Sequence, residues 1–139
     1  MKFRGKYGFL SNFYEVEIRY GSLKFKCVES AFQALKSKDY SVRKSFENLN
    51  GVDSKRLGRK IKLREDWNII KIDVMRYLLK IKFNNNEMRR RLLALEDEYI
   101  VEENSWNDRF WGVDEKSGEG LNMLGKLIME IREEIRKEG

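Results

Sequence analysis

Glu29, Gln33 and Lys36 are the residues of this sequence whose types and spacing are best suited to chemistry. They belong to the stretch 28–36, which lacks Gly and Pro and is rich in helix-forming residues, so it predicts a helix. At 3.6 residues per turn the three side chains share one face, and the apolar residues between them form a second face that would pack on a core. The same pattern is typical of amphipathic helices whose charged side chains are only solvated. Spacing alone leaves both interpretations open.

The composition excludes several kinds of catalytic site. The 139 residues include no His and one Cys, Cys27. A Ser-His-Asp or Cys-His nucleophile is therefore excluded, and a zinc site would need carboxylates and one thiolate alone. Proton transfers would fall to Glu, Asp, Lys or Tyr. We expect an active site without a metal ion or a cofactor.

Asp108 is a second carboxylate in a setting that favours chemistry. It lies in the aromatic loop 105–112, between Trp106 and Trp111. Closely spaced Trp residues usually indicate packing, but their surroundings can shift the pKa of a carboxylate placed among them. Asp108 is therefore a candidate catalytic group.

Three further polar residues have two interpretations each. Ser11 and Asn12 stand between apolar residues, where they either hydrogen-bond their own turn or present donors to a ribose or phosphate. Arg59 follows Gly58, a residue that lets backbones approach closely, and is either an anion ligand or a surface Arg.

A pocket built from the 28–36 helix, the Ser11-Asn12 loop and the Asp108 loop would suit cleavage of a glycosidic bond to nitrogen. Aromatic walls fit a flat base, and carboxylates suit the oxocarbenium character that develops at the sugar. One carboxylate would activate water while a second group protonates the departing nitrogen. Alternatively, Lys36 would attack the anomeric carbon as a nucleophile with a lowered pKa.

Two longer patterns must position these residues. Alternation of period two in 15–19 and 23–28, on either side of a Gly-containing turn, predicts a β-hairpin that leads into the 28–36 helix. The longest helical pattern, 64–83, is apolar on more than one side, which predicts a central and largely buried helix.

Shorter helices and a closing helix complete the predicted fold. Ser41 is expected to cap one short helix, and Asp53 or Ser54 the next. Residues 121–137 predict an amphipathic helix. Together these patterns predict a mostly helical α+β fold with a small antiparallel β-sheet, in a single domain over residues 1–139.

The charge of the chain is unevenly distributed. The net charge is +6, and residues 55–91 carry thirteen basic against four acidic residues, whereas 92–139 carry six against thirteen. The basic segment would attract a phosphate-bearing substrate or nucleic acid, or it decorates exposed helix faces. One Cys and the absence of a stretch long enough to span a bilayer predict a cytoplasmic protein without a membrane partner.

Short motifs follow one another in register along the chain. They are Gly5–Tyr14, Val28–Lys36, Leu57-Gly58-Arg59, Asp66-Trp67, Met75, Lys82-Phe83, Val101-Glu102, Asp108, Trp111-Gly112 and Gly120–Lys126. In this order and at these separations, the chain resembles the NADAR family, the YbiA-like N-glycosidases, over nearly its whole length.

The resemblance implies an enzyme that acts on ribose attached to nitrogen. Some members of the family are similar to hydrolases of phosphoribosylamino pyrimidine intermediates of riboflavin synthesis. Others look like glycohydrolases that remove ADP-ribose from modified guanine, with ADP-ribosylated DNA as a partner. We therefore expect an ADP-ribosyl or phosphoribosyl N-glycoside as substrate.

The resemblance also assigns roles to individual residues. It matches Glu29, Lys36 and Asp108 to catalytic positions of the family. It implies that substrate-binding positions are Gly5, Ser11, Asn12, Phe13, Gln33, Arg59, Trp67, Trp111 and Asn122. One departure is Ser30, which stands where the family usually has a His after the Glu.

Two other functions compete with hydrolysis. The same pocket would serve a non-catalytic module that binds NAD or ADP-ribose. A small basic nucleic-acid-binding protein would explain only the charge of 55–91, and no reading element is recognisable in the sequence.

Overall fold

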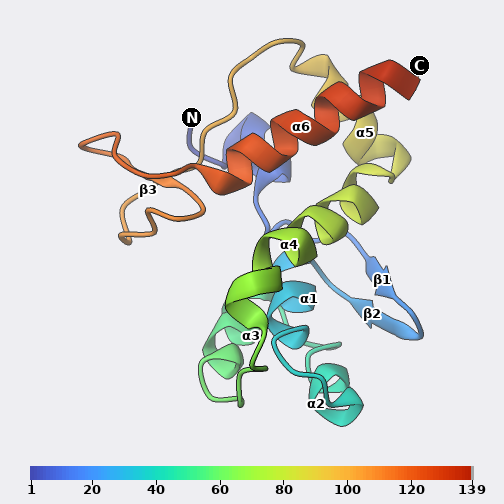
Figure 1. Ribbon diagram of the computed structural model, residues 1–139. Coiled ribbons are helices and arrows are strands. Elements are labelled where there is room, and N and C mark those ends of the chain that lie inside the picture. The colour runs from blue at the N-terminus through green and yellow to red at the C-terminus, as the bar shows by residue number, and fades with distance from the viewer. Residues whose placement is uncertain (139) are drawn as a thin grey trace. The chain divides into compact units, whose positions relative to one another are not determined.

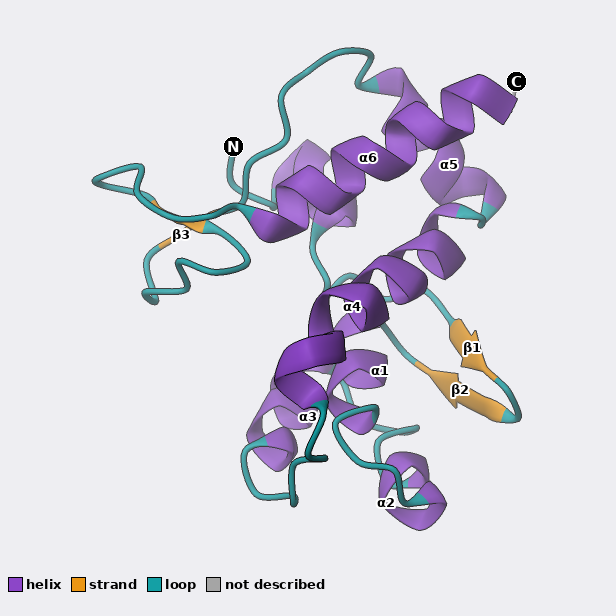
Figure 2. Cartoon of the chain, viewed as in Figure 1, coloured by secondary structure: helices purple, strands orange, loops and turns teal. Residues whose placement is uncertain are grey.

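The computed structural model describes residues 1–138 of the chain (Figures 1 and 2). These residues pack into two compact units, each described below by itself. Residues 12–82 form the α1 unit, and residues 1–11 together with the chain from 83 onward form the α6 unit. The prediction of a mostly helical α+β fold with a small antiparallel sheet is confirmed. That residues 1–139 make a single domain stays a prediction.

A short hairpin opens the α1 unit, as the alternating pattern predicts. Strands β1 (Ile18–Tyr20) and β2 (Leu23–Phe25) pair antiparallel, with Ile18 opposite Phe25 (Figure 2). Gly21 in the connecting turn has a φ of 58°, a left-handed value that Gly adopts without strain. The strands are shorter than the alternating stretches, and both pack on the helix that follows.

Three short helices follow the hairpin: α1 (Val28–Ala34), α2 (Tyr40–Lys44) and α3 (Gly51–Gly58). Asp39 caps α2, because its side chain accepts from the backbone N–H groups of Ser41 and Val42. Asn50 caps α3 by accepting from the N–H of Asp53 at 2.8 Å. The predictions that Ser41, and Asp53 or Ser54, are the caps are therefore wrong.

The longest helix of the chain is α4 (Trp67–Phe83). It begins three residues later than the predicted start at 64, because residues before Trp67 form a turn. Trp67 and Leu78 are buried as expected, but Val74 is only partly buried and Ile69 is 84% exposed. The helix is buried along one side and exposed along the other, which corrects the expectation that it is largely buried.

The α6 unit combines helices with a second, very small sheet (Figure 1). Its elements are the 3-10 helix η1 (Gly5–Leu10), α5 (Asn86–Ala94), β3 (Glu103–Asn104), β4 (Val113–Asp114) and α6 (Met123–Glu138). Strands β3 and β4 pair parallel. This pair was not predicted, since two-residue strands are too short to show alternation.

The closing helix α6 supplies the apolar core of its unit. Its inward residues are Leu124, Leu127, Ile128, Ile131 and Ile135, all of them buried. The helix packs on α5, and the predicted amphipathic helix over 121–137 is confirmed apart from its first two residues. No helix among the described residues is long and apolar enough to cross a membrane.

Candidate active site

Helix α1 carries the buried carboxylate of the candidate site. Glu29 lies in its first turn, and its backbone N–H donates to the carbonyl of Asn12 at 3.0 Å, so the preceding loop is fixed to the helix start. The Glu29 side chain is only 7% exposed. The amide of Gln33, one turn later, donates from Nε2 to Oε1 of Glu29 at 3.2 Å. The predicted sharing of one helix face by Glu29 and Gln33 is thus observed.

Lys36 lies just beyond the end of α1, which is two residues shorter than the predicted helix. Leu35 keeps helical backbone angles, and the N–H of Lys36 donates to the carbonyl of Gln33 at 3.2 Å, so the chain continues to turn. Burial lowers the pKa of the Lys36 amine, and the Glu29 carboxylate opposes this shift. Glu29 and Lys36 therefore interact electrostatically despite the early end of the helix.

Two amide oxygens next to this pair are buried without a hydrogen-bond donor from residues 1–138. They are Oε1 of Gln33 and Oδ1 of Asn12. The other end of the Asn12 amide donates to Sδ of Met75 at 3.6 Å, a weak contact. A buried polar atom without a partner costs about 1–3 kcal/mol. Oε1 of Gln33 lies against Gly58 of α3, whereas a ligand with N–H or O–H groups that reached Oδ1 of Asn12 would remove the cost there.

Aromatic packing joins α1 to the start of α4. The rings of Phe32 and Trp67 lie 4.9 Å apart between centroids, tilted by 58°. The loop between α3 and α4 is tied to the end of α1, because the N–H of Arg64 donates to the carbonyl of Lys36 at 2.8 Å. Trp67 is consequently fixed near the charged pair by the apolar face of α1.

Phe13 and Arg59 lie on either end of α3. A Cβ added to Gly51, the first residue of α3, would come within 2.6 Å of the Phe13 ring, so this phenyl group lies directly on the helix start. Arg59 follows the last residue of α3 and is exposed. Its charge acts on the Lys36 amine and lowers the pKa of that amine.

Ser30 is buried on the side of α1 that faces Leu49 and Ser54. Its hydroxyl donates to the carbonyl of Leu49 at 2.9 Å and receives a hydrogen bond from Ser54 at 2.8 Å. Sγ of Cys27 lies 3.3 Å from the same oxygen. The residue at the position where the family usually has His thus forms internal contacts in this chain.

Asp108 is fixed in the α6 unit by its own turn. One carboxylate oxygen, Oδ1, accepts from the N–H groups of Phe110 and Trp111 at 3.1 and 2.9 Å. Among the described residues no hydrogen bond reaches Oδ2. The side-chain amide of the buried Asn104 donates to the backbone carbonyl of Asp108 and accepts from the backbone N–H of Asp108. One oxygen of the carboxylate therefore holds the turn, and a catalytic role for the Asp108 side chain stays a prediction.

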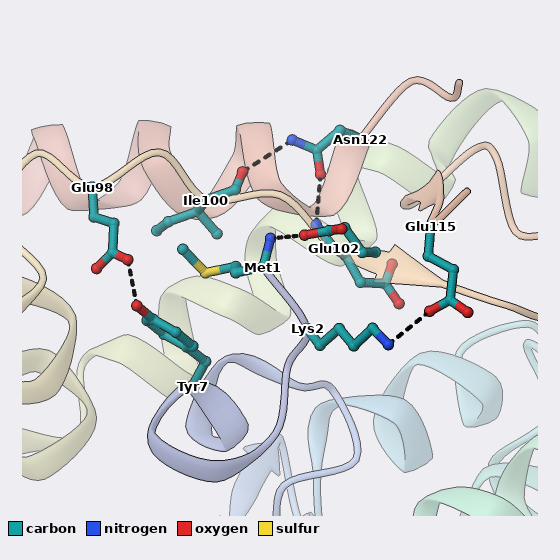
Figure 3. A network of polar contacts seen from close by, with 9 residues as sticks. Met1, Lys2, Tyr7, Glu98, Ile100, Glu102, Glu115 and Asn122 are labelled. Carbon is teal, nitrogen blue, oxygen red and sulfur yellow. Dashed lines mark hydrogen bonds and ion pairs between the residues drawn. The ribbon is translucent and has the colours of Figure 1, made fainter. Parts of the chain in front are cut away.

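Asn122 precedes α6 and bridges two backbone groups (Figure 3). Its amide accepts from the N–H of Glu102 and donates to the carbonyl of Ile100, each at 3.0 Å. The same view shows Lys2 paired with Glu115 at 3.1 Å and Tyr7 donating to Glu98. Because both ends of its amide are used within the protein, Asn122 serves to hold the 100–102 segment.

The remaining predicted site residues also belong to the α6 unit. Gly5 begins η1 with a φ of 59° and is exposed. The N–H of Ser11 donates to the carbonyl of Gly8 at the end of that helix. Trp111 packs edge to face on Phe110, with centroids 4.8 Å apart.

The structure thus gathers part of the predicted site around α1. The gathered residues are Asn12, Phe13, Glu29, Gln33, Lys36, Arg59 and Trp67. Gly5, Ser11, Asp108, Trp111 and Asn122 belong to the other unit, and the cleft that Asp108 was expected to share with Glu29 stays a prediction.

Three residues near these groups were not singled out from the sequence. Asn104 orients the Asp108 turn, and Lys55 and Lys71 act electrostatically on Lys36. The only signal for Lys55 was its position four residues before Arg59, which places both on one helix face. Lys71 is likewise four residues after Trp67.

The chain is similar to known proteins over nearly its whole length. The family model of the NADAR domain matches residues 2–136. The N-glycosidase YbiA of Shigella boydii is 36% identical over 136 residues, covering 95% of this chain and 84% of the relative. A riboflavin biosynthesis protein of Vibrio vulnificus is 34% identical over 94% of this chain, which spans 36% of the length of that relative.

A solved structure has the same fold. The NMR structure of Escherichia coli YbiA matches with a TM-score of 0.85 and 34% identity, covering 99% of this chain and 85% of the YbiA chain. A match at this level of identity and coverage extends the likeness from sequence motifs to the whole backbone. With the family model matched almost from end to end, this chain belongs to the NADAR domain family.

Proposed function

We propose that this protein is an N-glycoside hydrolase that cleaves an N-ribosidic bond, with Glu29 and Lys36 as catalytic groups and Asp108 assisting. The observation that carries the proposal is the Glu29–Lys36 pair. A buried carboxylate acts on a half-buried amine whose pKa is lowered by desolvation. Such perturbed groups cluster at catalytic sites. The YbiA relatives are also named N-glycosidases.

Two mechanisms use this pair. In the first, Lys36 loses a proton to Glu29, and its free amine attacks the anomeric carbon while the bond to the base nitrogen breaks. Glu29 returns the proton to the departing nitrogen. Water then hydrolyses the bond between Lys36 and the sugar, which restores the amine and releases the ribosyl product. In the second, water attacks the anomeric carbon and gives a proton to Glu29 while the bond to the base nitrogen breaks, Glu29 passes this proton to the departing nitrogen, and Lys36 only positions the substrate.

The substrate in this proposal is an anionic N-riboside. One candidate is an ADP-ribosyl group on guanine, including ADP-ribosylated DNA. The other is a phosphoribosylamino pyrimidine intermediate of riboflavin synthesis, which is favoured by the similarity to the riboflavin biosynthesis protein of Vibrio vulnificus. We place the reaction in the cytoplasm, since the single cysteine of the chain is a buried free thiol.

The buried amides support a site that holds a sugar or base. Oε1 of Gln33 and Oδ1 of Asn12 are buried without a donor from residues 1–138, and the amide of Gln33 also contacts Glu29. Ribose hydroxyls and exocyclic amino groups of a base are hydrogen-bond donors. A site with unsatisfied amide oxygens favours ligands that carry such donors.

The test is incubation of the purified protein with ADP-ribosylated guanine DNA, with a phosphoribosylamino pyrimidine and with NAD. Chromatography would detect the released ribosyl product. We expect release from at least one N-riboside, in the presence and in the absence of a chelator. Tight binding of ADP-ribose without cleavage of any substrate would replace the hydrolase by a binding module.

A further inference from the structure

The chain that carries Lys36 leaves α1 at a helix end, where the helix no longer supplies all the hydrogen bonds. Helix α1 ends at Ala34, and the N–H of Lys36 still donates to the carbonyl of Gln33 at 3.2 Å. The last carbonyls of a helix have no helical partner, so donors from elsewhere must satisfy them. The residue that supplies these donors therefore also fixes the backbone from which the Lys36 side chain starts.

Arg64 supplies donors to two carbonyls at this helix end. Its backbone N–H donates to the carbonyl of Lys36 at 2.8 Å. Nη1 of its guanidinium makes a longer hydrogen bond, of 3.5 Å, to the carbonyl of Leu35. A cationic donor at the carboxyl end of a helix is also favoured by the helix dipole. The backbone and the side chain of one residue thus hold the two peptide groups that flank the Cα of Lys36.

Asp66 orients the guanidinium of Arg64. Nε and Nη2 of Arg64 donate to the two carboxylate oxygens of Asp66, at 2.7 and 3.2 Å. A contact at two points fixes the plane of a guanidinium, which a contact at one point does not. The side chain of Arg64 is only 16% exposed. Arg64 is therefore held in the orientation that directs Nη1 to the end of α1.

The start of α4 connects this ion pair back to α1. The carbonyl of Asp66 accepts from the N–H of Ile70 at 3.1 Å, which is a hydrogen bond of the first turn of α4. The next residue, Trp67, packs on Phe32 of α1, with 4.9 Å between the ring centroids. Arg64 therefore joins the end of α1 to a helix that is itself packed on α1.

We infer that Arg64 is a positioning residue for Lys36, because it holds the peptide groups on both sides of the Lys36 Cα and ties them to the start of α4. The inference rests on the proposed function, since it takes Lys36 as a group that meets the substrate. Arg64 acts through protein groups and needs no substrate contact of its own. A misplacement of about 1 Å costs up to about a hundredfold in rate, so loss of this hold should lower activity although every reacting group remains.

Three variants test the inference by activity: Arg64→Met, Arg64→Lys and Asp66→Asn. The matched control is Arg56→Met, because Arg56 is exposed and pairs with Asp53 of its own helix at 3.3 Å. On a cleaved N-riboside, Arg64→Met should lower kcat/KM about ten- to hundredfold. Arg64→Lys keeps the charge and one donor group, so it should lose less. The control should match the natural chain.

Titration of the Lys36 amine by NMR tests its placement without needing turnover. Lys36→Arg identifies the signal, which is missing from that variant. Burial lowers the pKa of Lys36, so a released chain end should raise this pKa in Arg64→Met. Asp66→Asn separates placement from charge. Loss of a negative charge alone would lower the pKa of a nearby amine, whereas release of Arg64 from its partner should raise the pKa of Lys36.

Natural kcat/KM in folded Arg64→Met would overturn the positioning role, even if hydrolysis is found. A Lys36 pKa that is unchanged or lower in Asp66→Asn would overturn it too, and this variant decides if Arg64→Met does not fold. A raised Lys36 pKa in Asp66→Asn, together with no cleavage of any N-riboside, would leave the positioning role standing and refute the hydrolase.

Discussion

The Gln33 amide donates a hydrogen bond to the Glu29 carboxylate at 3.2 Å, while its oxygen lies against Gly58 of the neighbouring helix. The orientation of the buried carboxylate thus depends on how closely α3 packs on α1. This relationship links the chemistry of the site to a glycine that takes no part in it.

Glu29→Gln and Lys36→Ala should each reduce turnover by about a hundred- to ten-thousand-fold, because removal of a positioned acid or base has that effect. Glu29→Gln keeps the shape of the side chain, so circular dichroism and thermal melting should change little. Steady-state assays on the identified N-riboside measure the effect. Full activity in Lys36→Ala would contradict the assigned mechanism.

Borohydride should trap an adduct between Lys36 and the opened sugar if the amine attacks. Only the neutral amine is nucleophilic, and burial lowers the pKa of Lys36. The rate should therefore rise with pH as this amine loses its proton, at lower pH than an ordinary lysine requires. Mass spectrometry of the reduced protein detects the adduct. Lys36→Arg is the matched control, since it keeps the charge but cannot form the bond.

If no adduct forms and Lys36→Arg stays active, the results would favour the second mechanism, in which water attacks the anomeric carbon and Glu29 accepts its proton. In that case the pH dependence of the rate should not follow the titration of Lys36.

Gly58→Ala should destabilise the protein by about 1–3 kcal/mol, which is the usual cost of overpacking. The added methyl group would collide with the Gln33 amide and displace the carboxylate that it orients. Activity should fall with stability, as measured by melting and by turnover below the melting temperature. Gly8→Ala is the control, because a Cβ there meets no atom within 4 Å. Equal melting temperatures for the two variants would contradict the packing argument.

Ser30→Ala should lower the free energy of unfolding by about 1–3 kcal/mol, because the carbonyl of Leu49 and the hydroxyl of Ser54 would lose their partner. Turnover by the folded variant should stay close to that of the natural chain, since Ser30 contacts protein groups. Chemical denaturation and activity assays measure the two effects separately. Ser30→His should be less stable still, because an imidazole does not fit this enclosed position. A strong loss of activity in a stable Ser30→Ala protein would assign the position a catalytic role.

Lys82 should make stability depend on pH. Its amine is buried, and desolvation lowers its pKa to about 7, whereas the amine of an unfolded lysine titrates near pH ~10.4. Between these values the unfolded state binds more protons than the folded state, so the free energy of unfolding should rise as pH increases from about 7 to about 10. Lys82→Met should remove this rise in denaturation curves, and the exposed Lys80→Met should keep it.

The sequence patterns predicted the elements with long periodicity and the candidate residues on them. Helix α6 and the hairpin were recognised because apolar spacing specifies a buried face. The caps were assigned to the wrong residues, since Asp39 and Ser41, or Asn50 and Asp53, are nearly equivalent in cap preference. Packing around the helix ends decides between such neighbours.

The sequence did not indicate features that depend on tertiary contacts, such as the effect of Lys55 and Lys71 on Lys36. Lys55 and Lys71 are sixteen positions apart in the chain and act on Lys36 only because α3 and α4 both pack on α1. The exposed side of α4 was unexpected for a similar reason. Ile69 is apolar but mostly exposed to solvent, and composition does not distinguish an apolar residue that is buried from one that is not.

The buried thiol of Cys27 can serve as a probe of local unfolding around α1. The side chain is fully buried beside Ser30, at the start of α1, and the sequence contains no other thiol. A thiol reagent therefore modifies the native chain only in molecules in which α1 has separated from its neighbours. The rate of labelling gives the frequency of that separation, and a ligand bound beside Glu29 should slow it in proportion to its occupancy.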